Sequence, residues 1–277
     1  MTINCNGFLI DLSSPKVMGI PNLTPDSFYD GGKYKEESQI LSQVEKMLHA
    51  GATFIDLGAY SSRPGSDHIS IEEEQRRIVP IVGLLISNFP DIILSIDTFR
   101  SKIAKYCIEA GAAIINDISA GNLDKNMIST VGKLKVPYIM MHMKGTPQTM
   151  KSLNQYEDIV QDIQFYFSQK VVEARRKGIN DIIIDPGFGF AKNIGQNFEL
   201  LKKLELLQLQ GLPILAGVSR KSMIYKTLDI PPSEALNGTT TLNTIALLNG
   251  ASILRVHDVK EAIQCIALVN KYEEHTL

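Results

Sequence analysis

Two carboxylates and one amide stand in or at the end of short apolar stretches. Asp97 closes residues 92–97, Asn116 lies within residues 113–118, and Asp185 lies near the end of residues 182–186. Carboxylates accept hydrogen bonds from N–H groups, whereas an amide both donates and accepts. The three predict a complement for a heterocycle with an amino-pyrimidinone edge. The alternative is that Asp97 and Asp185 cap the helices that follow them, as aspartate often does.

A second group of side chains is basic. Arg255 and His257 are two residues apart, so they share one face of a strand, and Arg63 follows another apolar stretch. Such a cluster suits a phosphate or pyrophosphate group. The alternative is a structural salt bridge, for instance between Arg255 and Asp258.

Two further features have a structural and a functional interpretation. His142 lies inside the apolar residues 138–143, which favours a core histidine over a catalyst. Gly187 and Gly189 lack the spacing of a dinucleotide or P-loop fingerprint. They predict tight turns, or a close approach of the backbone to a flat ring on which Phe190 stacks.

Eight short apolar runs, most followed by a stretch of helical periodicity, must position these side chains. This alternation is typical of parallel strands joined by crossover helices. We expect strands over residues 17–22, 54–59, 92–97, 113–118, 138–143, 182–186, 214–218 and 253–257. Helices are expected over residues 36–50, 71–87, 156–177 and 236–249, three of which end at a glycine.

The repeat predicts an α/β fold, a (β/α)8 TIM barrel, with an open doubly wound sheet as the alternative. The 277 residues form one domain, 1–277, close to the roughly 250 residues typical of such barrels. Residues 3–12 precede the first unit and are expected to form a short hairpin at the barrel floor. Active sites of these barrels assemble at the carboxyl ends of the strands, and phosphate sites lie near the last two strands.

Composition limits the class of partner and the compartment. The 28 basic and 30 acidic residues give a net charge of −2, so nothing indicates binding to nucleic acid or to a membrane surface. Cys5, Cys107 and Cys265 show neither a disulfide framework nor zinc spacing, which favours a reducing cytoplasm. The N-terminus lacks signal-peptide character and no segment approaches the ~18 apolar residues of a membrane helix. We expect a soluble, cytoplasmic protein.

A series of motifs along the chain resembles the dihydropteroate synthase family of pterin-binding TIM barrels. The longest covers residues 18–28 (MGIPNLTPDSF) and continues at residues 30–32 (DGG). The others are residues 61–65 (SSRPG), 95–98 (SIDT), 115–117 (IND), 141–147 (MHMKGTP), 185–190 (DPGFGF), 217–222 (GVSRKS) and 255–259 (RVHDV). The resemblance therefore spans essentially the whole chain.

The resemblance implies condensation of a pterin pyrophosphate with p-aminobenzoate in folate synthesis, by a homodimer that sulfonamides target. It implies a pterin pocket of Asp97, Asn116, Met141, Asp185, Phe190, Gly217 and Lys221. Arg63, Arg255 and His257 would bind the pyrophosphate, and Asn22 would hold Mg²⁺. Phe28, Ser62, Pro64, Lys221 and Ser222 would border the p-aminobenzoate. Asp30 would offset the positive charge of a pterin cation formed when the C–O bond breaks first.

The chain departs from the family pattern in its second strand and after the sixth. Residues 58–62 read GAYSS where GGEST is commoner, so Tyr60 replaces a glutamate and Ser62 a threonine. Ala191 replaces the glycine usual after Phe190.

Three other functions remain open from these residues. A corrinoid methyltransferase would share the pterin pocket without needing Arg63, Arg255 and His257. An aldolase could use Lys221 as a Schiff-base nucleophile. A pterin-binding paralogue without catalysis is expected to lose Asn22, Asp30 or Arg63, all of which are present.

Overall fold

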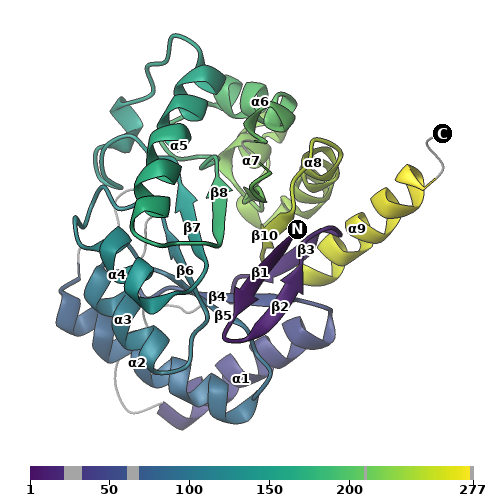
Figure 1. The fold of residues 1–277 in the computed structure, drawn as a ribbon. Helices are drawn as coiled ribbons and strands as arrows, with labels where there is room; N and C mark the ends of the chain where they lie inside the picture. The colour runs from purple at the N-terminus through teal and green to yellow at the C-terminus, as the bar shows by residue number, and fades with distance from the viewer. Residues whose placement is uncertain (22–32, 61–68, 209–210, 275–277) are drawn as a thin grey trace.

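The computed structural model describes residues 1–21, 33–60, 69–208 and 211–274, with only the backbone of residues 33–36. Eight parallel strands form the central sheet (Figure 1): β3 (Lys16–Gly19), β4 (Phe54–Leu57), β5 (Leu94–Asp97), β6 (Ile114–Asp117), β7 (Tyr138–Met141), β8 (Ile182–Asp185), β9 (Leu215–Ala216) and β10 (Ile253–Val256). All eight predicted strands are present, each ending at or before its predicted end. Residues 186–187 and 217–218 turn away from the sheet because they belong to the loops that build the site.

The sheet closes on itself. Its order is β8-β7-β6-β5-β4-β3-β10-β9, and a parallel bridge between Ile184 and Ile214 joins β8 to the β9 side. The N–H of Ile184 also donates to the carbonyl of Pro213 at 3.0 Å. The predicted (β/α)8 barrel is confirmed, and the open sheet is excluded.

Helices surround the barrel on its outer side (Figure 1). They are α1 (Lys33–His49), α2 (Ile71–Asn88), α3 (Ser101–Glu109), α4 (Met127–Leu134), α5 (Ile159–Arg176), α6 (Ile194–Lys202), α7 (Ser222–Leu228), α8 (Leu236–Leu248) and α9 (Val259–Glu273). Short 3₁₀ turns lie at η2 (Met150–Ser152), η3 (Leu204–Leu207) and η4 (Pro232–Glu234). Caps fix several starts: the Ser70 hydroxyl accepts from Glu73 N, and Asn193 forms a capping box with Gln196 at the start of α6. The apolar helix faces and the outer strand faces form the main core.

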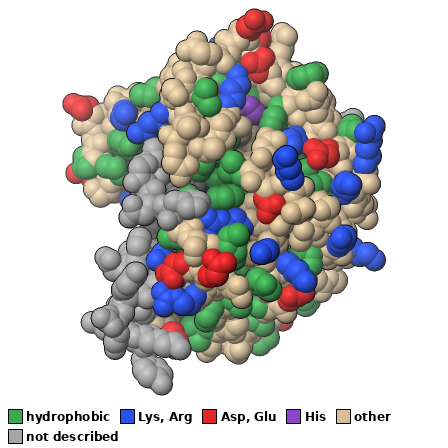
Figure 2. All heavy atoms as spheres, turned by 90° about the vertical axis from the view of Figure 1, so that its left-hand side faces the viewer, with side chains coloured by type: hydrophobic (Ala, Val, Ile, Leu, Met, Phe, Trp, Pro, Cys, Tyr) green, Lys and Arg blue, Asp and Glu red, His purple; other side chains and the backbone are tan. Residues whose placement is uncertain are grey.

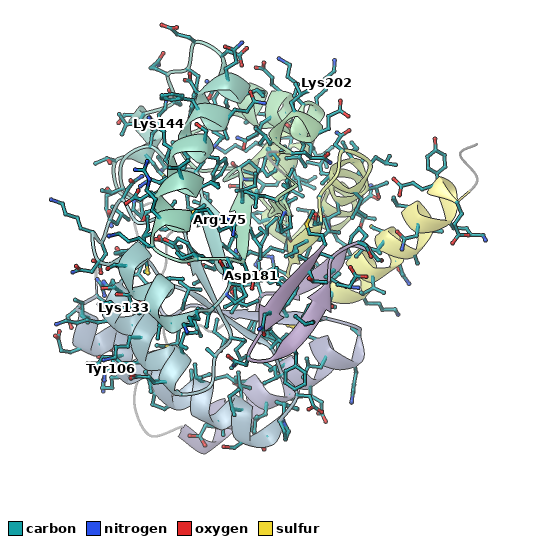
Figure 3. All side chains as sticks on the ribbon, viewed as in Figure 1. Tyr106, Lys133, Lys144, Arg175, Asp181 and Lys202 are labelled. Atoms are coloured by element: carbon teal, nitrogen blue, oxygen red, sulfur yellow. The ribbon has the colours of Figure 1, made fainter. Side chains whose placement is uncertain are left out.

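The predicted hairpin is present as β1 (Thr2–Cys5) and β2 (Phe8–Asp11), paired antiparallel. Ile3, Cys5 and Leu12 pack against side chains at the amino ends of the barrel strands, among them Met18 and Phe54. The N–H of Asn4 donates to Asp181 just before β8, and Figure 3 labels Asp181 beside the hairpin. The hairpin therefore covers the barrel floor, opposite the carboxyl ends of the strands.

The side chains that point into the barrel change from apolar to polar within two residues along several strands. The floor layer is apolar and includes Phe54, Ile114, Ile183 and Ile253. Side chains two residues further on share the same inward face. On those strands they are Asp56, Asn116, Asp185 and Arg255. An apolar floor thus carries a polar second layer directly beneath the mouth.

Candidate active site

A small cavity lies at the mouth formed by the carboxyl ends of the strands. It is lined by Asp97, Asn116, Ile118, Met141, Asp185, Phe190, Gly217, Lys221 and Arg255. Its volume of about 20 Å³ is that of a space for one water, because the Arg255 side chain reaches into it. All seven residues predicted for the pterin pocket line this cavity, together with Arg255.

The loop after β8 carries one wall of the cavity. The Asp185 carboxylate accepts from the N–H of Gly187 at 2.7 Å, so it holds its own loop and caps no helix. Gly187 has φ +72°, and a Cβ at this position would lie 2.2 Å from the carbonyl oxygen of His142. Only glycine fits there, and the turn presents Phe190, which packs with Met141 and Ile118.

Lys221 lies at the start of α7 and reaches back across this wall. Its ammonium donates to the carbonyl of Phe188 and lies 5.0 Å from the centre of the Phe190 ring. A Cβ on Gly217 would lie 3.7 Å from the Lys221 nitrogen. This is an ordinary van der Waals distance, so a small side chain at this position would contact the Lys221 nitrogen without a clash.

Arg255 pairs with two aspartates of neighbouring strands. Its Nε donates to Asp56 Oδ2 at 2.7 Å, and its Nη2 donates to Asp97 Oδ2 at 2.9 Å. Asp258, the partner proposed in the structural alternative, instead pairs with Arg220 at 2.8 Å. That alternative was wrong in its pairing, although Arg255 does form a buried ion pair. Asp97 likewise caps no helix, since α3 begins after Arg100.

Burial shifts the titration of the charged groups around the cavity. It raises the pKa of Asp97 to about 7, although the Arg255 guanidinium opposes the shift. It raises the pKa of Asp185 as well, against the attraction of Lys221. Burial lowers the pKa of Lys221 to about 8, against the attraction of Asp185. A carboxylate and a lysine that titrate near neutral pH in one cavity are typical of a functional site.

Besides Ile118, two residues of the site escaped the sequence analysis. Asp56 lies in the middle of β4 under the cavity, and period-two spacing from Phe54 could have revealed it. Lys192 donates to His142 Nδ1 at 3.1 Å, to the Gly187 carbonyl at 3.0 Å and to the Phe190 carbonyl at 2.9 Å. It fastens the loop after β8 to β7, and nothing in the local sequence indicates this.

His142 is a core histidine, as its apolar surroundings in the sequence predicted. Its side chain is buried, bonded to Lys192 and packed edge-on against Tyr166 with ring centres 4.8 Å apart. Burial lowers the pKa of His142 well below its usual value. A neutral histidine in this position supports the loop rather than reacting.

His257 follows β10 and Ser222 follows Lys221 in the chain, and neither of them lines the cavity. The hydroxyl of Ser219 accepts from the His257 backbone N–H at 3.3 Å and lies 3.0 Å from His257 Nδ1. Ser222 is the first residue of α7. Both remain predicted site residues.

Six predicted site residues lie outside the described ranges: Asn22, Phe28, Asp30, Ser62, Arg63 and Pro64. Two of the departures from the family pattern can be described. The Tyr60 hydroxyl accepts from Gln148 at 3.1 Å, and its ring packs edge-on against Phe99. Ala191 has φ +50°, a left-handed conformation that glycine adopts more readily, which explains why glycine suits this position.

A larger hollow of about 420 Å³ lies beside the mouth, between the start of α2 and the loops after β5 and β6. Two of its charged groups serve the fold: Arg100 pairs with the buried Glu74 at 2.7 Å, and Asp124 accepts from Ser101 N at 2.8 Å. Figure 2 shows basic and acidic side chains mixed over one face of the molecule. Polar groups from several strands converge in the smaller cavity, which makes it the candidate active site.

The chain matches known proteins over almost its whole length. The family model described as "Pterin binding enzyme" matches residues 18–257. The dihydropteroate synthase of Escherichia coli K12 is 38% identical over 271 residues, covering 97% of this chain and 95% of the relative. The dihydropteroate synthase of Yersinia pestis, solved with a sulfonamide drug complex, superimposes with a TM-score of 0.92 at 40% identity over 99% of this chain and all of that one.

A further solved structure carries a small-molecule ligand. The dihydropteroate synthase of Xanthomonas albilineans with 4-aminobenzoic acid superimposes with a TM-score of 0.90 at 33% identity, covering 98% of each chain. The family match, the whole-chain identities and the barrel mouth lead to one assignment. The chain belongs to the pterin-binding enzymes, among the dihydropteroate synthases.

Proposed function

We infer that this chain condenses 6-hydroxymethyl-7,8-dihydropterin pyrophosphate with p-aminobenzoate, giving 7,8-dihydropteroate and pyrophosphate. The observation that carries this inference is the cavity at the barrel mouth, where Asp97, Asn116, Asp185 and Lys221 converge beside Met141 and Phe190. Polar groups that specify orientation against apolar walls are typical of small-molecule sites.

The order of these groups around the barrel supports a dihydropterin in particular. Along the ring edge the 4-oxo group accepts, N3–H and the 2-amino group donate, N1 accepts and N8–H donates. From β9 to β5 the barrel presents Lys221, Asp185, Asn116 and Asp97. In this order Lys221 would donate to the 4-oxo group, and Asp185 would accept from N3–H and the 2-amino group. Asn116 would pair with the 2-amino group and N1, and Asp97 would accept from N8–H.

The chemistry requires stabilisation of a leaving group more than a strong base. The pterin C–O bond breaks with its electron pair going to pyrophosphate, and the arylamine lone pair forms the new C–N bond before the nitrogen loses a proton. Arg63, Arg255 and His257 would stabilise the charge that grows on the pyrophosphate. Asp30 would offset the positive charge on the pterin carbon, and Phe28, Ser62, Pro64 and Ser222 would border the arylamine.

We propose Mg²⁺ as the cofactor, held by Asn22. Among the described residues, no group of three or more His, Cys, Asp and Glu side chains could hold a metal. This fits magnesium, which often takes few protein ligands and completes its shell with water and substrate phosphate oxygens. Bound there, the ion would neutralise charge on the pyrophosphate.

We also propose a homodimer that works in the cytoplasm. Helices α8 and α9 expose large apolar side chains, among them Leu248, Leu268 and Tyr272, and such surfaces commonly mark interfaces. In the described part of the chain, no helix has the length and apolar character needed to cross a bilayer. Sedimentation at several concentrations tests the dimer.

Incubation with the pterin pyrophosphate, p-aminobenzoate and Mg²⁺, followed by detection of dihydropteroate, tests the reaction. The proposal predicts product that depends on all three. Pterin binding without product would favour a non-catalytic paralogue, and methyl transfer from methyltetrahydrofolate would favour the corrinoid enzyme. Trapping of Lys221 with borohydride and a carbonyl substrate would favour the aldolase.

A further inference from the structure

Asp56 is a buried carboxylate beneath the mouth, yet it does not line the cavity. It is 1% exposed in the middle of β4. Its Oδ1 accepts from the Ser95 hydroxyl at 2.6 Å. Its Oδ2 accepts from Asn116 Nδ2 at 3.1 Å and from Arg255 Nε at 2.7 Å. A buried charge is retained at a cost that only such pairing offsets.

The contact with Asn116 decides which way that amide faces. The oxygen and nitrogen of an asparagine side chain have nearly the same shape, so neighbouring hydrogen bonds determine their orientation. An ionised carboxylate only accepts, so it stabilises the orientation in which Nδ2 points at Asp56. Asn116 Oδ1 and the second N–H are then left for a ligand in the cavity that Asn116 lines.

We propose that Asp56 is a positioning residue that makes the site select a 2-amino-4-oxo pteridine over its 2,4-dioxo counterpart. Asn116 in this orientation offers an acceptor to the 2-amino group and a donor to N1. In the dioxo ring, position 2 becomes an acceptor and N1 carries a hydrogen. Both contacts are then mismatched unless the amide turns over, which would set its oxygen against the Asp56 carboxylate.

The proposal rests on the inferred binding of the pterin in this cavity, and an asparagine at position 56 tests it. In Asp56→Asn a neutral amide replaces the carboxylate. Because Arg255 Nε donates to the same position as Asn116 Nδ2, the new NH₂ faces Asn116 only when Arg255 keeps its pair with Asp97 alone. Asn116 can then adopt both orientations. Ser95→Ala is the matched control, because it removes one hydrogen bond to the same carboxylate but leaves the charge and its contact with Asn116.

The measurement is calorimetry with 6-hydroxymethyl-7,8-dihydropterin and with 6-hydroxymethyl-7,8-dihydrolumazine, its 2-oxo counterpart. The natural protein and Ser95→Ala should prefer the pterin by about a hundredfold or more, as two mismatched hydrogen bonds imply. In Asp56→Asn the preference should fall by at least about tenfold. A structural role alone would lower the thermal stability of both variants without changing this ratio.

The outcomes separate this inference from the proposed function. If the natural protein does not bind the pterin, both fail. If it binds the pterin but Asp56→Asn keeps the natural preference, only the role of Asp56 is overturned. Should Asp56→Asn not fold, Asp56→Ser replaces it, because a hydroxyl also donates and accepts and the same fall in preference is expected.

Discussion

The guanidinium of Arg255 lies 2.9 Å from the carboxylate of Asp97 across the mouth of the barrel. The same guanidinium is anchored to Asp56 at 2.7 Å through its Nε atom. Arg255 can therefore release Asp97 to a ligand N–H without losing its place in the barrel. The ion pair that occupies the cavity would then open as the ring enters.

Arg255→Ala should lower turnover of the pterin pyrophosphate by more than it lowers affinity for the free pterin. Negative charge grows on the pyrophosphate as the C–O bond breaks, so a nearby cation is worth more in the transition state than in the ground state. The variant should also lose about 3 kcal/mol of stability, because Asp56 keeps a buried charge without its cation.

Arg220→Ala is the control for Arg255→Ala, since Arg220 pairs with Asp258 away from the cavity lining. It should lose stability while its kcat and pterin affinity stay near natural values. If Arg255→Ala bound the free pterin much more weakly but turned over the ester at the natural rate, its assignment to the leaving group would be wrong.

Asp185→Asn should weaken pterin binding by about 1.5–3 kcal/mol, the worth of a hydrogen bond to a charged group. Its oxygen can still accept from Gly187, which turns its NH₂ toward the N–H donors of the ring. Stability should change little, because burial already raises the pKa of Asp185 and makes its charge unfavourable. Calorimetry that gave unchanged affinity would count against this pocket.

Pterin affinity should pass through a maximum between about pH 7 and about pH 8. It rises as Asp97, with its pKa raised to about 7, ionises and becomes an acceptor. It falls as Lys221, with its pKa lowered to about 8, loses its proton. Ionisation of Asp97 has the opposite effect on the stability of the fold. Because its pKa is raised in the folded state, Asp97 contributes stability at low pH that is lost as the pH rises through about 7.

Titrations across this range, corrected for ionisation of the free pterin, test the profile. Asp97→Asn should lose the acidic limb and keep the alkaline one. Persistence of the acidic limb in this variant would assign it to another group.

Gly187→Ala should cost about 1–3 kcal/mol of stability and disrupt pterin binding, because a Cβ there would lie 2.2 Å from the His142 carbonyl. Gly178→Ala is a matched control: Gly178 has a similar φ of +83° but no atom within 4 Å of its Cβ position. Urea unfolding compares the two. Equal costs would mean that backbone conformation alone, and not the approach to His142, requires glycine 187.

The sequence revealed the parts of the site that contrast with their surroundings. Asp97, Asn116 and Asp185 stand out because polar side chains interrupt apolar strands, and the barrel then brings them to one mouth. Asp56 obeys the same rule but was not predicted, because it lies within β4 and not at its end. Its pairing with Arg255 joins residues 199 positions apart, and no local pattern encodes such a contact. The hydrogen bonds from Lys192 to the loop after β8 and to His142 likewise depend on the closed barrel.

The most direct test measures dihydropteroate and pyrophosphate together, in the same reactions, for the natural protein and for Asp185→Asn. We predict one pyrophosphate for each dihydropteroate in both, with kcat/KM about ten- to hundredfold lower in the variant. No dihydropteroate from the natural protein would contradict the assigned reaction, and equal rates in the two proteins would contradict the assigned pocket.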